Sequence, residues 1–213
     1  LTSDWIKLHG QHESGTEQFI LDHLKPQSTF LDIGANIGYF SLLAAITAKA
    51  KAVAFEPQQQ IADLLVQSAI YNGVQDSIKV EKVALSNTPA TMKMSFSPGN
   101  TGHSQLVEAD SSDAQSYLVP VVPLDEWMTH NPLGTVSVCK IDVEGVDLQV
   151  LEGMSKLLSR DQPALVIELI DENLAAFGSS HSTLFDFLKV HGYVDVSSRY
   201  TFRGDSNGYF VKG

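Results

Sequence analysis

Short apolar runs alternate with segments of helical periodicity along most of this chain, and this alternation constrains the fold more than any other feature. The runs STFLDI (28–33), AVAFE (52–56) and IKVEKVAL (78–85) are predicted strands, and YFSLLAAITA (39–48) is a predicted helix. A second helix precedes the third run, with one apolar face formed by Ile61, Leu64, Leu65 and Ala69. Continuously apolar strands joined by helices are typical of a parallel sheet with both faces covered.

The second half of the chain repeats the pattern. VSVCKIDVE (136–144) and ALVIEL (164–169) are predicted strands, and HSTLFDFLKVHG (181–192) is a predicted helix. The helix between those two strands carries one apolar stripe: Val150, Leu151, Met154, Leu157 and Leu158. Residues 193–198 and 207–213 predict a hairpin that puts an antiparallel strand at or near one edge. We therefore expect an α/β, Rossmann-like fold, mostly parallel, with helices on both faces, unlike the six parallel strands of nicotinamide-binding sheets.

The alternation fails from Asn87 to Asp125, where Ser, Gly, Asp and Asn are frequent. We predict two additional strands there, around Met92–Phe96 and Tyr117–Val121, joined by a polar loop at 97–116. Long loops inside compact domains are usually functional or mobile. We expect this loop and the segment Trp5–Glu17 to form the substrate pocket.

Composition limits the kinds of partner. The chain has 25 Asp and Glu against 14 Lys and Arg, a net charge of −11, and no cluster of basic residues. This argues against nucleic acid and anionic membrane surfaces as partners. No apolar run is long enough to span a membrane, the start lacks a signal-peptide pattern, and the one cysteine, Cys139, has no disulfide partner in the chain. We expect a cytoplasmic protein of one domain, 1–213, with a lead-in (1–28) and a core (29–213); the sequence does not indicate an oligomeric state.

The stretch FLDIGANIGYF interrupts a strand-to-helix junction with polar residues and glycines. Asp32 ends the strand, and Gly34 and Gly38 bracket the turn. Glycine permits positive φ and close approach of a ligand, and amides at a helix start can accept an anion. The spacing D-x-G-x-x-x-G differs from both the dinucleotide fingerprint and the P-loop. A purely structural turn and a cradle for an adenosyl ligand both stay open on this stretch alone.

Two further stretches narrow the choice. Glu56 follows Asp32 by 24 residues at the end of the next strand, where an acid can accept the hydroxyls of a ribose. In KIDVEG, Asp142 and Glu144 are expected to point the same way from one strand and to form an acidic mouth at the ligand-binding edge of the sheet. They could also cap the helix that begins near Val146, and the two roles are compatible.

FLDIGANIGYFSLLAA, AFEP, VALSN, VPLDEW and KIDVEGVDLQVLEG occur in an order and spacing that resembles the FkbM-type family of S-adenosylmethionine-dependent methyltransferases, over roughly Gly15–Glu168. The resemblance implies a class I methyltransferase fold with S-adenosylmethionine across the ends of the first, second and fourth strands. By position it implies these cofactor-binding residues: Glu17, Asp32, Gly34, Ala35, Asn36, Gly38, Glu56, Pro57, Gln58, Ala84 and Asp142, with Val83 and Leu85 beside the adenine.

Methyl transfer to a hydroxyl requires an aligned acceptor and a base for its proton. We expect O-methylation of a small molecule or sugar, with Glu144 or His103 as the base. His103 could equally be an exposed loop residue. The amino-methylating subclass is disfavoured because its Asn/Asp-Pro-Pro-aromatic motif is missing.

Three alternatives remain. A catechol-type magnesium site could use Asp142, Glu168, Asp171 and Asn173, although we predict no metal. A cofactor-binding module without activity also stays open. A nicotinamide-dependent oxidoreductase is disfavoured by the glycine spacing and the terminal hairpin.

Overall fold

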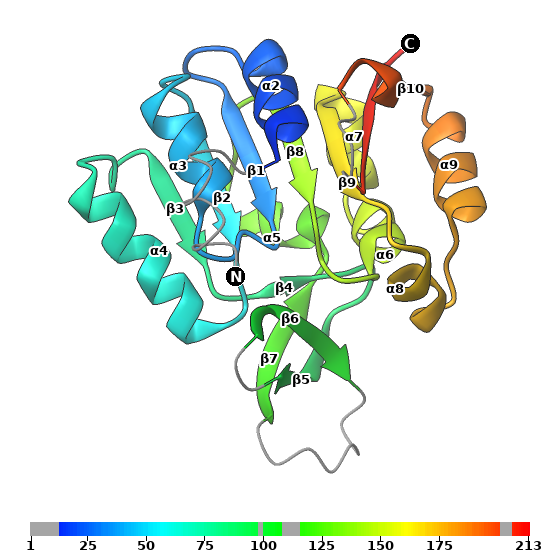
Figure 1. Cartoon of the computed structure of the whole chain (residues 1–213), viewed down its shortest axis with the longest axis horizontal. Helices are drawn as coiled ribbons and strands as arrows, with labels where there is room; N and C mark the ends of the chain where they lie inside the picture. Colours follow the sequence, from blue (N-terminus) through cyan, green and yellow to red (C-terminus); the bar gives the residue numbers. More distant parts are fainter. Residues whose placement is uncertain (1–12, 98–99, 108–115, 201–205) are drawn as a thin grey trace.

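The main sheet carries the architecture in this computed structural model, which describes residues 13–97, 100–107, 116–200 and 206–213. Its order is β10-β11-β9-β8-β1-β2-β3 (Figure 1). Strand β11 runs antiparallel to both neighbours, and the other pairings are parallel. The strands are β1 (Thr29–Ile33), β2 (Lys51–Phe55), β3 (Ile78–Glu81), β8 (Val136–Ile141), β9 (Ala164–Glu168), β10 (Tyr193–Asp195) and β11 (Asn207–Lys212). The mostly parallel sheet and the C-terminal hairpin are confirmed.

Two hydrophobic clusters lie on opposite faces of this sheet, because successive strand residues point to opposite sides. Phe30 and Val138 pack in one cluster, whereas Leu31 and Cys139 pack in the other. The first is covered by α2 (Ser14–His23), α3 (Tyr39–Ile46) and α4 (Gln59–Tyr71). The second is covered by α5 (Leu124–His130), α6 (Asp147–Glu152), α7 (Ser155–Asp161), α8 (Asp171–Ala176) and α9 (His181–Val190). A 3-10 turn, η1 (Ser197–Arg199), lies between β10 and β11.

Two predicted helix faces need correction. In α4, Leu64 is 47% exposed, and Ala62 is buried beside the other predicted face residues. The helix predicted after β8 is two short helices, α6 and α7, although all five residues of its predicted stripe are buried. The break lies at Gly153, where a side chain would come within 2.1 Å of the Ser86 carbonyl oxygen. That contact is non-local, so local periodicity could not reveal it.

A second sheet occupies the irregular stretch. It has the order β4-β7-β5-β6, with β4 (Ala84–Leu85), β5 (Ala90–Ser97), β6 (Asn100–Val107) and β7 (Ser116–Val122). Figure 1 shows it beyond the ends of β1 and β8. Strands β5 and β7 match the two predicted additional strands, but β6 lies within the predicted polar loop, and IKVEKVAL is divided between β3 and β4 in different sheets. Whether 1–213 forms one domain stays a prediction.

Within the described ranges, no helix combines the length and the apolar character needed to cross a bilayer.

Candidate active site

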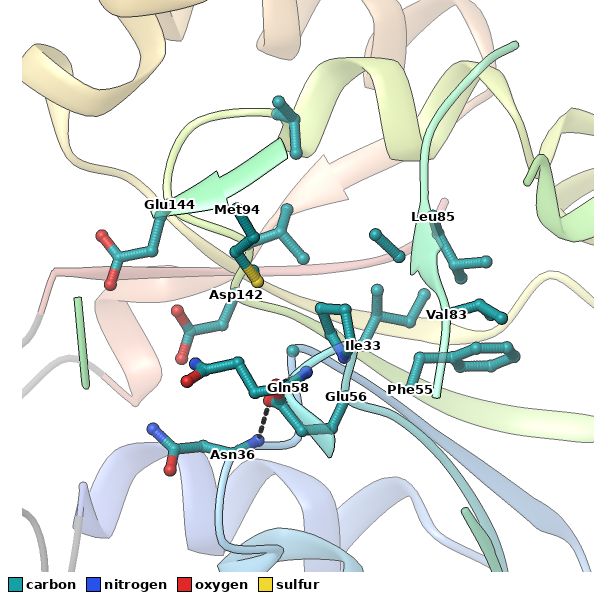
Figure 2. A pocket seen from close by; sticks show the side chains of 15 residues that line it. Ile33, Asn36, Phe55, Glu56, Gln58, Val83, Leu85, Met94, Asp142 and Glu144 are labelled. Atoms are coloured by element: carbon teal, nitrogen blue, oxygen red, sulfur yellow. Dashed lines mark hydrogen bonds between the residues drawn. The ribbon is translucent and has the colours of Figure 1, made fainter. Parts of the chain in front are cut away.

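A pocket opens where the carboxyl ends of β1, β2 and β8 meet the second sheet (Figure 2). Parallel α/β sheets bind ligands at this edge. Its lining comprises Ile33, Gly34, Asn36, Phe55, Glu56, Pro57, Gln58, Val83, Ala84, Leu85, Met94, Asp142, Val143, Glu144 and Val146. The pocket is therefore apolar on the side of β4 and β5 and carries carboxylates where β2 and β8 end.

The glycine turn after β1 has a structural reason for each of its two glycines. Gly34 has φ +77°, and a Cβ there would lie 1.8 Å from the carbonyl oxygen of Asp142. Gly38 has φ +83°, and its Cβ would meet Leu65 Cγ at 2.3 Å. Gly34 thus lets the turn pass against the segment after β8 and lines the pocket, whereas Gly38 lets α3 start against α4. Both glycines thus have a structural role, and the ligand-binding role of the turn stays a prediction.

Asp32 lies beneath the turn. Its side chain is buried, and its Oδ2 accepts a hydrogen bond of 2.7 Å from the Ser41 hydroxyl. Its Oδ1 is buried without a hydrogen-bond partner among the described residues. Burial raises the pKa of this carboxyl, while Lys140 and the Ser41 bond oppose the rise. Asp32 does not line the pocket, so its predicted contact with the cofactor stays a prediction.

Glu56 lies on the pocket floor, at the end of β2 (Figure 2). Its Oε2 accepts a hydrogen bond of 2.9 Å from the backbone N–H of Asn36, and its Oε1 accepts one of 2.8 Å from the backbone N–H of Gln58. Burial raises the pKa of this carboxyl to about 7, and the two backbone bonds limit the rise. Each oxygen keeps acceptor capacity for a second donor. Adjacent hydroxyls of a ligand would match this arrangement.

The acidic mouth exists, but for a different reason than predicted. Strand β8 ends at Ile141, so Asp142 and Glu144 lie in the following loop, and Glu144 has φ +56°. Asp142 Oδ2 is 2.7 Å from the ammonium of Lys140, and Glu144 Oε2 accepts 2.8 Å from the amide of Asn173. Both still line the pocket because the loop, rather than strand alternation, presents them.

The predicted capping role is wrong, because no side chain caps the start of α6. The residue before α6, Val146, receives no side-chain cap, and Asp147 instead accepts 3.2 Å from the N–H of Gly145. Asp147 is buried, which raises its pKa to about 7. The loop that carries Asp142 and Glu144 is thus held from within by Asp147.

The pocket brings together ten of the residues proposed from the sequence: Gly34, Asn36, Glu56, Pro57, Gln58, Val83, Ala84, Leu85, Asp142 and Glu144. Four others do not line it. Gly38 and Asp32 lie behind the turn, Ala35 is buried, and Glu17 on α2 accepts a hydrogen bond from the Tyr39 hydroxyl. His103 belongs to β6, and its side chain lies outside the described residues, as does the segment 1–12.

Sequence reasoning missed two residues that shape the site. Met94, from β5, reaches into the pocket and accepts a hydrogen bond from Tyr117 at 3.3 Å. No local pattern links β5 to this edge of the main sheet. Lys140 is the second, and a lysine inside an otherwise apolar strand, two residues before an acid, was the available signal.

The magnesium alternative concerns the acids next to this pocket. Burial raises the pKa of Glu168 to about 9, and the charges of Asp142, Glu144 and Asp147 add to the rise. Asn173 is engaged by Glu144. Among the residues that the structure describes, no group of three or more His, Cys, Asp or Glu is arranged to hold a metal ion. The absence of a metal stays a prediction.

Comparison with known proteins bears on this geometry. The Methyltransferase FkbM domain matches residues 32–194. Among curated proteins, the chain is 26% identical over 161 residues to methyltransferase sdnD of Sordaria araneosa, covering 62% of each protein. It is 24% identical over 146 residues to hexuronic acid methyltransferase AglP of Haloferax volcanii, covering 68% of this chain and 58% of that protein. A third match, 26% identical and covering 83% of this chain, spans 10% of AMB antimetabolite synthetase AmbE of Pseudomonas aeruginosa. The chain thus spans less than two thirds of each relative.

Solved structures share the fold. An FkbM methyltransferase from Methylobacillus flagellatus has a TM-score of 0.56 at 16% identity, covering 91% of this chain and 50% of its own. Geranyl diphosphate methyltransferase in complex with S-adenosylmethionine has a TM-score of 0.55 at 15% identity, and the match covers 98% of this chain and 87% of that one. An rRNA methylase from Streptococcus thermophilus has a TM-score of 0.56 at 13% identity, and the match covers 92% of this chain and 91% of that one. The fold is that of class I methyltransferases, and with three quarters of its length matched by the domain, the chain belongs to the FkbM family of S-adenosylmethionine-dependent methyltransferases.

Proposed function

We propose that this chain methylates a hydroxyl group of a small molecule or sugar. The observation that carries the proposal is the position of Glu56, with both oxygens oriented by backbone N–H groups on the floor of a pocket whose mouth holds Asp142 and Glu144. The similarity to a protein named hexuronic acid methyltransferase supports a sugar-like acceptor.

The lining suggests how the cofactor would be held. Glu56 would accept the two ribose hydroxyls, which matches its remaining acceptor capacity. The glycine turn at Gly34 and Asn36 would face the methionine part. Pro57 and Gln58 would lie on one side of the adenine and the apolar stretch Val83–Leu85 on the other. Asp142, which pairs with Lys140, would attract the positive charges of the cofactor.

The cofactor supplies an activated methyl group, so the protein needs mainly to align the acceptor and take its proton. Glu144 is the better-supported base of the two predicted. It lines the pocket, and the 2.8 Å bond from Asn173 fixes the orientation of its carboxyl. A carboxylate held in this way can accept the acceptor's hydroxyl proton as the new oxygen–carbon bond forms. His103 stays a prediction.

Incubating the purified chain and a cell extract with methyl-labelled S-adenosylmethionine tests the activity. We expect label in an alkali-stable product of the small-molecule or glycan fraction, as an ether would be. Label confined to alkali-labile esters or to amines would contradict O-methylation of a hydroxyl. If S-adenosylhomocysteine binds but no fraction acquires label, the chain is a binding module and the proposal fails.

Once an acceptor is identified, Glu144→Gln tests the base. Because general bases typically contribute 10²–10⁴-fold, we expect kcat to fall by about 100-fold or more. Affinity for S-adenosylhomocysteine, measured by calorimetry, should stay within about twofold. Glu126→Gln, on α5 outside the pocket lining, is the matched control and should leave both values unchanged. A Glu144→Gln variant with full kcat would remove Glu144 from this role.

A further inference from the structure

Lys140 is buried inside β8, although lysine is among the residues least often buried. Only 3% of its surface is exposed, and it lies on the sheet face covered by α2 and α3, with its ammonium 5.3 Å from the Phe40 ring centroid. Taking an ammonium out of water costs several kcal/mol unless it is paired. Lys140 lies next to the pocket without lining it, so nearby groups must offset the cost of burying its charge.

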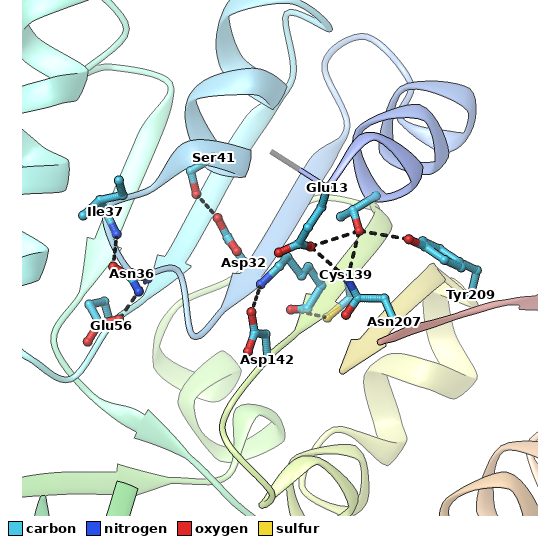
Figure 3. A network of polar contacts seen from close by, with 12 residues as sticks. Glu13, Asp32, Asn36, Ile37, Ser41, Glu56, Cys139, Asp142, Asn207 and Tyr209 are labelled. Atoms are coloured by element: carbon cyan, nitrogen blue, oxygen red, sulfur yellow. Dashed lines mark hydrogen bonds and ion pairs between the residues drawn. The ribbon is translucent and has the colours of Figure 1, made fainter. Parts of the chain in front are cut away.

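The reason lies in the carboxylates around it. Its Nζ is 2.7 Å from Asp142 Oδ2 (Figure 3). Burial lowers the pKa of Lys140, but the charges of Asp142, Asp32 and Glu13 outweigh burial and raise it. The ammonium therefore stays protonated at any physiological pH. It sits between an acid behind the glycine turn, an acid on the pocket wall and an acid at the start of α2.

The geometry at Asp142 shows what the pairing does. The side chain of Asp142 is 30% exposed and lines the pocket, whereas that of Lys140 is 4% exposed. One carboxylate oxygen, Oδ2, is thus turned inward to the buried ammonium, and the group as a whole faces the ligand space. Without the ammonium, Asp32 behind the pocket and Asp142 on its wall would repel each other with no compensating charge.

The other side of Lys140 is equally fixed. Glu13 Oε2 accepts 2.8 Å from the amide of Asn207 and 3.2 Å from the Thr16 hydroxyl, and Thr16 meets the Tyr209 hydroxyl at 3.1 Å (Figure 3). These bonds join the start of α2 to β11. The negative charge of Glu13 on this side of Lys140 is therefore held in place by two elements.

We infer that Lys140 is a positioning residue for cofactor binding, which acts by holding the Asp142 carboxylate in one orientation on the pocket wall. The inference rests on the proposed cofactor pocket and adds a residue that does not touch the ligand. It predicts that Lys140 and Asp142 contribute to affinity as a unit.

The test measures S-adenosylhomocysteine affinity by calorimetry for wild type, Lys140→Met, Asp142→Asn and the double variant. We expect each single variant to bind about tenfold or more weakly, and the double variant to bind no more than about twofold weaker than Asp142→Asn alone. Lys79→Met is the matched control: Lys79 also pairs with an acid two residues on, Glu81 at 2.8 Å, but is half exposed on an edge strand. Its affinity should equal that of wild type.

A merely structural lysine would give a different result. Lys140→Met would then melt at a lower temperature but bind with wild-type affinity once folded, and this outcome overturns the inference. So does an additive loss in the double variant. If Lys140→Met does not fold, Lys140→Gln takes its place in the same comparison and is judged by the same criteria. If wild type itself does not bind, the proposed pocket fails and the inference falls with it.

Discussion

At the scale of single residues, the ionisation of the Glu56 carboxyl is opposed by burial and favoured by its hydrogen bonds. The residue is 5% exposed, so burial opposes ionisation of its carboxyl, while two backbone N–H groups favour the ionised form. The result is a pKa raised from 4.5 to about 7. Without ligand, Glu56 is mainly protonated below about pH 7. The contribution of this protonated carboxyl to folding stability is fully present below about pH 4.5 and is lost as the pH rises through about 7.

Ribose hydroxyls would reverse this preference, because two donors stabilise the ionised carboxylate. We therefore expect S-adenosylhomocysteine affinity to rise between pH 6 and 7.5 and to level off above, by up to about tenfold per pH unit below the pKa. Calorimetry across this range checks the slope. Asp147 also titrates near 7, so Glu56→Gln serves as the control: it should bind weakly and lose the rise. A wild-type affinity that is flat over this range would contradict the ribose role.

At the scale of elements, the features that could be predicted from the sequence are those that depend on residues close together along the chain. The strands β1, β2, β8 and β9 and the turn at Gly34 were predicted because their signals, apolar runs and glycine spacing, are local in sequence. The break between α6 and α7 depends on Ser86, the split between β3 and β4 on pairing with β7, and the place of Met94 on docking of the second sheet. Each needs a partner far along the chain, which periodicity does not contain.

The contact between the β1 turn and the loop after β8 yields a prediction at this scale. Gly34→Ala adds a Cβ that would overlap the Asp142 carbonyl oxygen, on top of the strain of positive φ. We expect it to lower the free energy of unfolding by about 3 kcal/mol or more and to abolish cofactor binding. Gly73→Ala is the matched control, since Gly73 has φ +67° but a Cβ added there would meet no atom within 4 Å. This substitution should cost only about 1 kcal/mol. Denaturant unfolding compares them; equal losses would show that the close approach does not matter.

At the scale of the whole molecule, the main sheet and both its helix layers meet at the pocket, so ligand binding should stabilise the entire fold. S-adenosylhomocysteine at about 100 times its Kd should add about 2.7 kcal/mol and raise Tm by roughly 5–10 °C. NAD should leave Tm unchanged, because the turn lacks the dinucleotide glycine spacing. Thermal denaturation with each ligand makes the comparison. A shift with NAD and none with S-adenosylhomocysteine would contradict the assignment of the pocket.

Net charge adds a second whole-molecule prediction, since rRNA methylases share this fold. RNA affinity comes largely from Lys and Arg that neutralise phosphates, and this chain has 14 of them against 25 acids. Its pocket mouth is also lined by Asp142 and Glu144, which would repel a phosphate backbone next to the reacting group. We therefore expect no mobility shift of tRNA or rRNA fragments at about 150 mM salt with up to about 1 μM protein, a concentration at the tight end of the dissociation constants of about 1–100 μM that are typical of non-specific binding. Binding that survives this salt, or label transferred to RNA, would instead indicate a nucleic-acid acceptor and overturn the choice of a small molecule or sugar.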